Sequence, residues 1–275
     1  MIELQCPYCH AEISDRSKFC TECGASLAGV SDRAEQQRSA AGMAASSGMV
    51  LGAAARQARL SAPFDQNALI SDRAYNAILV GVLLWGLLVN ALLCAFAADF
   101  AANMNPIVFL IIYFVCAFAG IRMAAKSTNP FVSFLGYNLV VIPFGLTIAI
   151  LVSAYGGIGS DVVRDAFVYT LIISLGMMAV VMIAPDLFAK LGGALLGCLV
   201  GLVLCELVLL IFRVNQVVTD WIAAALFSLY IGYDIYRSQQ FPKTVDNAVD
   251  SALDIYLDIA NLFIRLLEIM GRRKD

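Results

Sequence analysis

Long apolar stretches separated by short charged segments dominate the chain from residue 74 onward. Four stretches carry no charged side chain and two more carry one carboxylate each. They are Ala74–Ala98, Phe100–Ile121, Ser127–Ser160, Ala166–Pro185, Leu191–Phe212 with Glu206, and Trp221–Tyr236 with Asp234. Because a helix needs about 20 apolar residues to cross the hydrocarbon core, this pattern predicts six membrane-spanning helices. Polar and glycine residues at both ends of the third stretch restrict its helix to roughly Phe131–Tyr155.

A seventh segment, Asp246–Met270, follows a different pattern. Aspartate recurs at every fourth position, at Asp246, Asp250, Asp254 and Asp258. Each such step advances about 40° around a helix, so the four carboxylates form a slowly rotating stripe that Asn261 and Arg265 continue. Amphipathic helices on a membrane surface usually carry Lys and Arg on the polar face. This acidic stripe therefore favours a helix that faces a polar interior over one that lies on the membrane surface.

The distribution of Lys and Arg predicts the orientation in the cell membrane. Eight basic residues flank the helix ends on the N-terminal side and two lie on the other side. The eight are Arg56, Arg59, Arg73, Arg122, Lys126, Lys190, Arg237 and Lys243, against Arg164 and Arg213. By the positive-inside rule the protein is multi-pass with a cytoplasmic N-terminus. A seventh full span would place the basic tail 272–274 outside the cell, against the positive-inside rule. Either the tail is tolerated there, or the last segment is re-entrant.

Composition divides the chain into three parts. Of its residues, 61% are hydrophobic and 14% charged, against about 25% charged in soluble domains. We expect an all-α polytopic membrane domain over residues 73–271. Residues 28–72 are rich in Ala, Ser, Gly, Gln and Arg and read as a flexible linker, with a weak helical signal at Met49–Leu60. Residues 1–27 form a small cysteine module, and nothing in the membrane region indicates binding to nucleic acid.

The N-terminal module contains two CxxC knuckles separated by ten residues. Their thiols belong to Cys6, Cys9, Cys20 and Cys23. Paired knuckles offer four thiolates to one tetrahedral ion, and Gly24 permits the second turn. The module resembles the short zinc ribbons at the N-termini of bacterial proteins, and we expect structural zinc because four thiolates close the coordination shell. Iron in a rubredoxin-like site is the alternative; disulfides are disfavoured in the cytoplasm, and His10 is expected to be a bystander.

Two aspartates, Asp234 and Asp258, lie 24 residues apart inside neighbouring apolar segments. Placing one aspartate at the centre of a membrane helix costs roughly 2.5–3.5 kcal/mol on insertion scales. We therefore expect a chain that keeps both residues to use them. Two such carboxylates close together cannot both ionise cheaply, and they can share one proton. The pair therefore suggests a pH sensor or a proton-coupled cation site. Arg122, at the end of the second stretch, is either a partner for this pair or an ordinary flanking charge.

The residues around both aspartates resemble the Bax inhibitor-1 (transmembrane BAX inhibitor motif, YccA-like) family. The matching segments are Leu-Tyr-Ile-Gly-Tyr-Asp at 229–234 and Ala-Leu-Asp-Ile-Tyr-Leu-Asp-Ile-Ala-Asn-Leu-Phe at 252–263. The resemblance implies a seven-transmembrane-helix bundle with the last helix central. It also implies a pH-sensitive calcium leak, in which Asp234 and Asp258 are the sensor and an arginine of the second helix is a latch. Arg122 corresponds to that arginine only by location.

Under this reading, different protonation states of the aspartate pair favour different packings of the sixth and seventh helices. Calcium prefers oxygen ligands and would pass near these carboxylates, with Glu206 and Asp254 as further acidic lining.

We do not expect an enzyme. The GxGD motif of presenilin-like proteases is missing, and the only histidine, His10, lies outside the membrane segments, which excludes rhomboid-type and HExxH chemistry. The alternative is a non-transport regulator of a membrane protease or a stress response that recruits a cytoplasmic partner through the zinc ribbon.

Overall fold

The computed structural model divides the chain into two units, Met1–Ala62 and Pro63–Asp275. The residues described are 4–5 and 12–13 in the first unit and 68–98, 100, 106–212 and 217–272 in the second. In the first unit, β1 (Leu4–Gln5) pairs antiparallel with β2 (Glu12–Ile13), with Leu4 opposite Ile13. The two strands flank the first CxxC knuckle. The four knuckle cysteines, the linker and its Met49–Leu60 segment lie outside the described residues.

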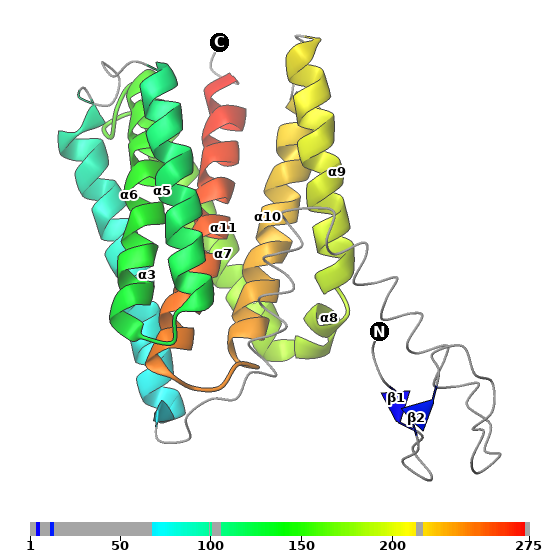
Figure 1. The fold of residues 1–275 in the computed structure, drawn as a ribbon. Helices are drawn as coiled ribbons and strands as arrows, with labels where there is room; N and C mark the ends of the chain where they lie inside the picture. Colours follow the sequence, from blue (N-terminus) through cyan, green and yellow to red (C-terminus); the bar gives the residue numbers. More distant parts are fainter. Residues whose placement is uncertain are drawn as a thin grey trace. The chain divides into compact units, whose positions relative to one another are not determined.

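The described part of the second unit consists of seven long helices and one short one (Figure 1). They are α3 (Asp72–Phe96), α5 (Pro106–Lys126), α6 (Pro130–Ala154), α7 (Asp161–Ile183), α8 (Pro185–Ala189), α9 (Gly192–Ile211), α10 (Val217–Ser238) and α11 (Val245–Arg272). By length and composition, α3, α6 and α7 can each cross a membrane. Shorter apolar segments occupy Ile111–Ala124 and Gly192–Glu206. Each predicted apolar stretch therefore contains a helix.

Local sequence fixes the starts of the three spanning helices. The Ser71 hydroxyl accepts a hydrogen bond from the Ala74 N–H at 3.3 Å, and Ser160 does the same for α7. The Asn129 side chain caps α6, and the next residue is proline, whose missing N–H costs nothing at the first helical position. Between α6 and α7, Gly156 and Gly157 adopt φ values of 95° and 79°, which favour glycine.

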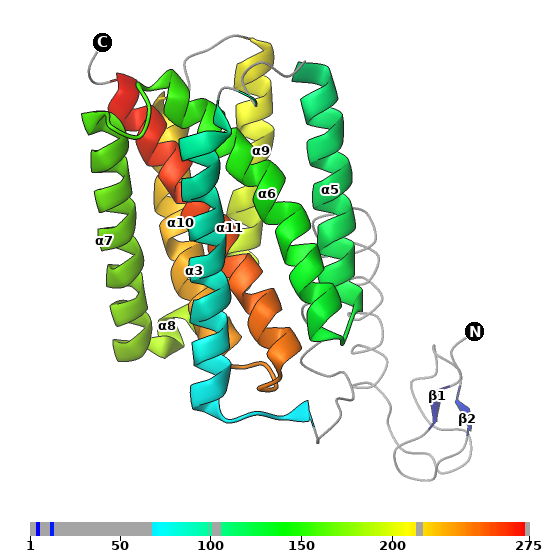
Figure 2. The same ribbon diagram turned by 90° about the vertical axis from the view of Figure 1, so that its left-hand side faces the viewer.

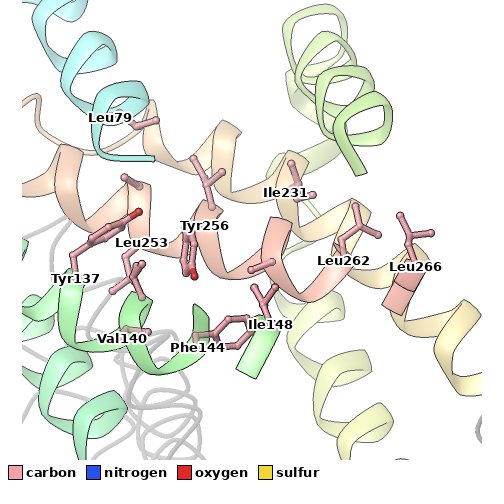
Figure 3. Packing of buried hydrophobic residues seen from close by; sticks show 14 of the residues in the cluster. Leu79, Tyr137, Val140, Phe144, Ile148, Ile231, Leu253, Tyr256, Leu262 and Leu266 are labelled. Atoms are coloured by element: carbon pink, nitrogen blue, oxygen red, sulfur yellow. The ribbon is translucent and has the colours of Figure 1, made fainter. Parts of the chain in front are cut away.

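The last helix, α11, is the centre of the bundle. It is continuous over 28 residues and packs against α3, α6, α7 and α10 (Figures 1 and 2). Leu253 and Tyr256 of α11 lie against Val140 and Phe144 of α6 (Figure 3). Meanwhile α5 packs on α6, and α9 packs on α10, as outer helices. The acidic segment thus faces the interior of the bundle as one continuous helix, and its crossing of the bilayer stays a prediction.

Glycines of α9 only partly account for close helix packing. The sequence predicts close packing at Gly192, Gly193, Gly197 and Gly201. Gly192 confirms it, because a Cβ there would overlap the Tyr233 side chain of α10, whereas a Cβ at any of the other three would have no neighbouring atom within 4 Å. A further close approach is at Gly86 of α3, where a Cβ would overlap the Tyr137 hydroxyl oxygen.

We therefore expect Gly86→Ala to lower the free energy of unfolding by about 2 kcal/mol, because the new methyl group displaces the buried Tyr137 ring. The matched control is Gly81→Ala on the same helix, where no neighbouring atom lies within 4 Å of the added Cβ. That change should be neutral or stabilising by up to about 1 kcal/mol, because alanine favours a helix interior. Unfolding of both variants in detergent measures the difference, and equal stability of the two would contradict the packing.

Candidate functional site

Both predicted aspartates are buried within the bundle. Asp234 on α10 has 5% of its surface exposed, and Asp258 on α11 has 8%. The two helices that carry them pack directly on each other. Asp254 lies one turn before Asp258 and is partly buried. The structure thus buries these two carboxylates on adjacent helices.

The end of the bundle at the α10–α11 loop is held against α3 by hydrogen bonds. The Tyr75 side chain is fully buried, and its hydroxyl donates to the Ser238 carbonyl at 2.8 Å. The same hydroxyl lies 3.1 Å from the Ser251 hydroxyl on α11. The Ile70 N–H donates to the Lys243 carbonyl at 2.8 Å. These bonds hold the end of α10, which lies four residues after Asp234, and the loop that follows it against α3.

Lys243 adds a positive charge to this end. Its Nζ lies 4.4 Å from the centroid of the Tyr75 ring and donates to the Gln239 carbonyl at 3.0 Å. Burial lowers the pKa of the Lys243 ammonium from its ordinary value, and the Asp72 carboxylate opposes that change. The lysine therefore joins the loop to α3 through both its charge and its contact with an aromatic face.

Two further polar contacts join α11 to its neighbours. The Ser133 hydroxyl of α6 donates to the Asp246 carboxylate at 2.6 Å, and both side chains are buried. Near the middle of the bundle, the Asn90 amide of α3 and the Tyr256 hydroxyl exchange hydrogen bonds of 2.8 and 3.0 Å. A buried polar group is costly without such a partner. Polar side chains of α3 and α6 thus bond to Tyr256 and Asp246 of α11.

A charged network lies at the opposite end of α11. Asp220, at the start of α10, is fully buried and accepts from Arg265 at 2.9 Å. A second guanidinium nitrogen of Arg265 donates to Glu206 of α9 at 2.8 Å, and the nitrogen that bonds Asp220 lies 3.5 Å from Glu268. Arg272 also pairs with Asp220. Three acids and two arginines thus link α9, α10 and α11 through a partly buried ion cluster.

A family model described as inhibitor of apoptosis-promoting Bax1 matches residues 67–275, which includes every helix of this bundle. The chain belongs to the Bax inhibitor-1 family. A zinc-ribbon domain matches residues 5–27, which contain both CxxC knuckles. The family assignment makes the protein a membrane protein.

Curated relatives of the chain come from two bacterial genera. A Helicobacter pylori (strain J99) protein is 36% identical over 129 residues, which is 46% of this chain and 54% of the relative. A Campylobacter jejuni protein is 33% identical over 128 residues, covering 46% of this chain and 53% of the relative. The chain thus spans about half the length of the curated relatives it matches.

Two residues predicted for the Bax inhibitor-1 site lie away from the aspartate pair. Arg122 is exposed on α5, and its guanidinium carbon lies 4.8 Å from the centroid of the Phe118 ring on the same helix. Within the described part of the chain it makes no ion pair with Asp234 or Asp258. Glu206 does not face an open path but pairs with Arg265. The structure thus brings the aspartates onto adjacent helices and leaves Arg122 outside that group.

Sequence reasoning missed the network around Asp220. This aspartate ends a charged segment just before an apolar stretch, which is also how an ordinary flanking residue looks. In the sequence alone, Arg265 is only a continuation of the polar stripe on the last segment. Its partners lie 45 and 59 residues away in sequence, so only the tertiary fold reveals the pairing. The available signal was an arginine inside an otherwise acidic face, which requires carboxylate partners when buried.

We expect Arg265→Gln to lower the free energy of unfolding by about 3 kcal/mol, because it leaves the buried Asp220 carboxylate with only Arg272 opposite. The matched control is Arg122→Gln, which removes an exposed guanidinium that stacks on a ring and should cost less than about 1 kcal/mol. Unfolding of both variants in the same detergent gives the comparison. Equal losses would mean that the network contributes no more than a surface contact.

Proposed function

We propose that this protein is a pH-sensitive calcium leak of the cell membrane, gated by Asp234 and Asp258. In this proposal, all seven long helices span the bilayer, α11 is the central span and the N-terminus is cytoplasmic. Protonation of the aspartate pair changes the packing of α10 against α11, and that change opens or closes a path for cations. Calcium is the permeating ion and has no resident site.

The observation that supports the proposal most is the burial of two carboxylates on adjacent helices, at 5% and 8% exposure. Removing ionised carboxylates from water is costly, so a proton taken up or lost by this pair alters the stability of the helix contact. The α10–α11 loop is fixed to α3 by Tyr75, and the other end of α11 is fixed by Asp220 and Arg265. In the proposal, a change in charge at the aspartates therefore acts on the α10–α11 pair between two fixed ends, the loop at Tyr75 and the ion cluster at Arg265.

The acidic residues near the pair suit brief contact with a cation better than retention of one. Among the described residues, no group of three or more His, Cys, Asp or Glu side chains is placed to hold a metal ion. In the proposal, Asp254 contributes acidic lining beside Asp258. Glu206 takes part only when its pair with Arg265 opens. We also propose that the protein is not an enzyme, since the aspartates serve as a titrating gate.

The gate is tested by calcium flux into proteoliposomes at a series of pH values. The wild-type flux should change with pH, and the flux of Asp234→Asn and Asp258→Asn should not, because neither amide can bind or release the shared proton. Asp186→Asn is the matched control, since Asp186 is exposed on α8. It should keep the wild-type profile. Full pH dependence in Asp258→Asn would refute the gate.

The zinc-ribbon match favours a second candidate function, that of an adaptor. In this alternative the protein regulates a membrane protease or a stress response, and the ribbon recruits a cytoplasmic partner. Removal of residues 1–62, the first compact unit, separates the two candidates. Flux that survives the truncation supports the leak, whereas loss of a co-purifying partner supports the adaptor.

Zinc fits the N-terminal module by its donors and by its local fold. Two paired strands, Leu4–Gln5 and Glu12–Ile13, stand on either side of the first CxxC in the sequence, and each CxxC offers two thiolates to one ion. Cys20 and Cys23 would complete the tetrahedral shell. When bound, the ion supplies folding energy to a segment too small to bury a core.

We expect about one zinc ion per purified chain by elemental analysis, and loss of that zinc in Cys20→Ser, because three thiolates hold the ion more weakly than four. Cys116→Ser is the matched control, since Cys116 lies within α5. It should retain the metal. Iron in place of zinc would indicate the rubredoxin-like alternative, and retention of zinc by Cys20→Ser would exclude the four-cysteine site.

A further inference from the structure

A cavity of about 480 Å³ lies between α3 and α7, with α11 at its base. Both α3 and α7 pack on α11 (Figure 2). The lining includes Leu87 and Ala91 of α3, Phe167 and Leu171 of α7, and Ile259 and Phe263 of α11. The volume falls in the range of small-molecule sites. It opens beside side chains on the outer surface of the bundle, since Phe167 is 58% exposed.

The polar side chains of the lining are already hydrogen-bonded within the protein. Asn90 is bonded to Tyr256, Thr170 donates to the Ala166 carbonyl at 2.7 Å, and Ser174 donates to the Thr170 carbonyl at 2.7 Å. None of them needs a partner from a ligand. The interior of the cavity therefore suits an apolar chain rather than a polar molecule or a row of ordered waters.

The length of the cavity matches one leaflet of a bilayer. Its lining on α7 runs from Val163 to Ser174, which is about 16 Å at 1.5 Å per residue. The hydrocarbon core is about 30 Å thick, so this is close to half of it. All charged residues of α7 lie in its first five positions, Asp161–Asp165. The cavity thus runs from the charged start of the helix toward the middle of the membrane.

One charged residue, Arg164, lines the cavity, and it pairs with two acids just outside the lining. Arg164 belongs to the lining, and its guanidinium lies 3.0 Å from Asp161 and 3.5 Å from Asp165. The side chains of these three residues are exposed by 66%, 61% and 47%. Ion pairs at such exposure are weak, so a phosphate can replace a carboxylate on the arginine. A zwitterionic lipid head offers both a phosphate for Arg164 and an ammonium for the two acids.

We propose that this cavity is a binding site for one zwitterionic phospholipid, with an acyl chain between α3 and α7 and the head group at Arg164, Asp161 and Asp165. The site is separate from the aspartate gate, and its presence does not depend on that function.

Native mass spectrometry of the full-length protein in mild detergent, titrated with phosphatidylethanolamine, tests the site. Ala91→Phe places a ring in the cavity and should weaken binding about tenfold. Ala77→Phe is the matched control, an exposed alanine of α3 outside the lining. It should bind as the wild type does. Equal binding by both variants would overturn the proposal.

The role of the head group is tested with diacylglycerol, which has the chains but no phosphate. Wild type should bind phosphatidylethanolamine more tightly than diacylglycerol, and Arg164→Gln should abolish that preference. Arg73→Gln is the control, an exposed arginine at the start of α3, and it should keep the preference. A wild type that binds both lipids equally would contradict the assigned head-group contacts.

A measurement without any substitution covers the case in which Ala91→Phe fails to fold. Cys94 lies in the lining, whereas Cys116 on α5 does not. Phosphatidylethanolamine should slow the modification of Cys94 by a maleimide and leave Cys116 unchanged as the internal reference. Equal rates at Cys94 with and without the lipid would count against the site.

Discussion

The burial of one acidic helix inside an apolar bundle is the constraint on which the rest of the structure depends. Carboxylates removed from water are costly unless they find donors or bind protons. On α11 the Ser133 hydroxyl of α6 meets this cost at Asp246, and on the neighbouring α10 Arg265 and Arg272 pair with the buried Asp220. Apolar residues of α11 such as Leu262 pack among the surrounding helices. The positions of the inner helices therefore follow from what α11 presents to them.

Three polar levels fasten α11 at different heights. The Tyr75 hydroxyl holds the α10–α11 loop, Asn90 holds Tyr256 in the middle, and Asp220 holds Arg265 at the far end. Between these levels the contact between α10 and α11 contains the aspartate pair. In the proposed gate, protonation repacks the middle of a helix whose two ends are held. Of the outer helices, α9 is tied to this network through Glu206, whereas α5 packs on α6.

Sequence predicted the parts of this fold that local composition controls. Charge-free stretches located the long helices because hydrophobic length is a property of the segment itself, and α6 was expected at Phe131–Tyr155 and occupies Pro130–Ala154. The interior position of α11 followed from an acidic face without the basic residues of a surface helix. The role of Arg265 and the open glycines of α9 could not be predicted, because each depends on which helix lies opposite. The surroundings of Arg122 depend on the fold in the same way: it is exposed on α5, which packs on α6, and its guanidinium lies over the Phe118 ring.

Amide hydrogen exchange on α10 and α11 as a function of pH tests the central claim most directly, that protonation of the buried aspartates changes the contact between these helices. After correction for the intrinsic pH dependence of exchange, wild-type protection on both helices should change with pH. In the Asp234→Asn, Asp258→Asn double variant it should stay constant. The same pH-dependent change in both proteins would contradict the account.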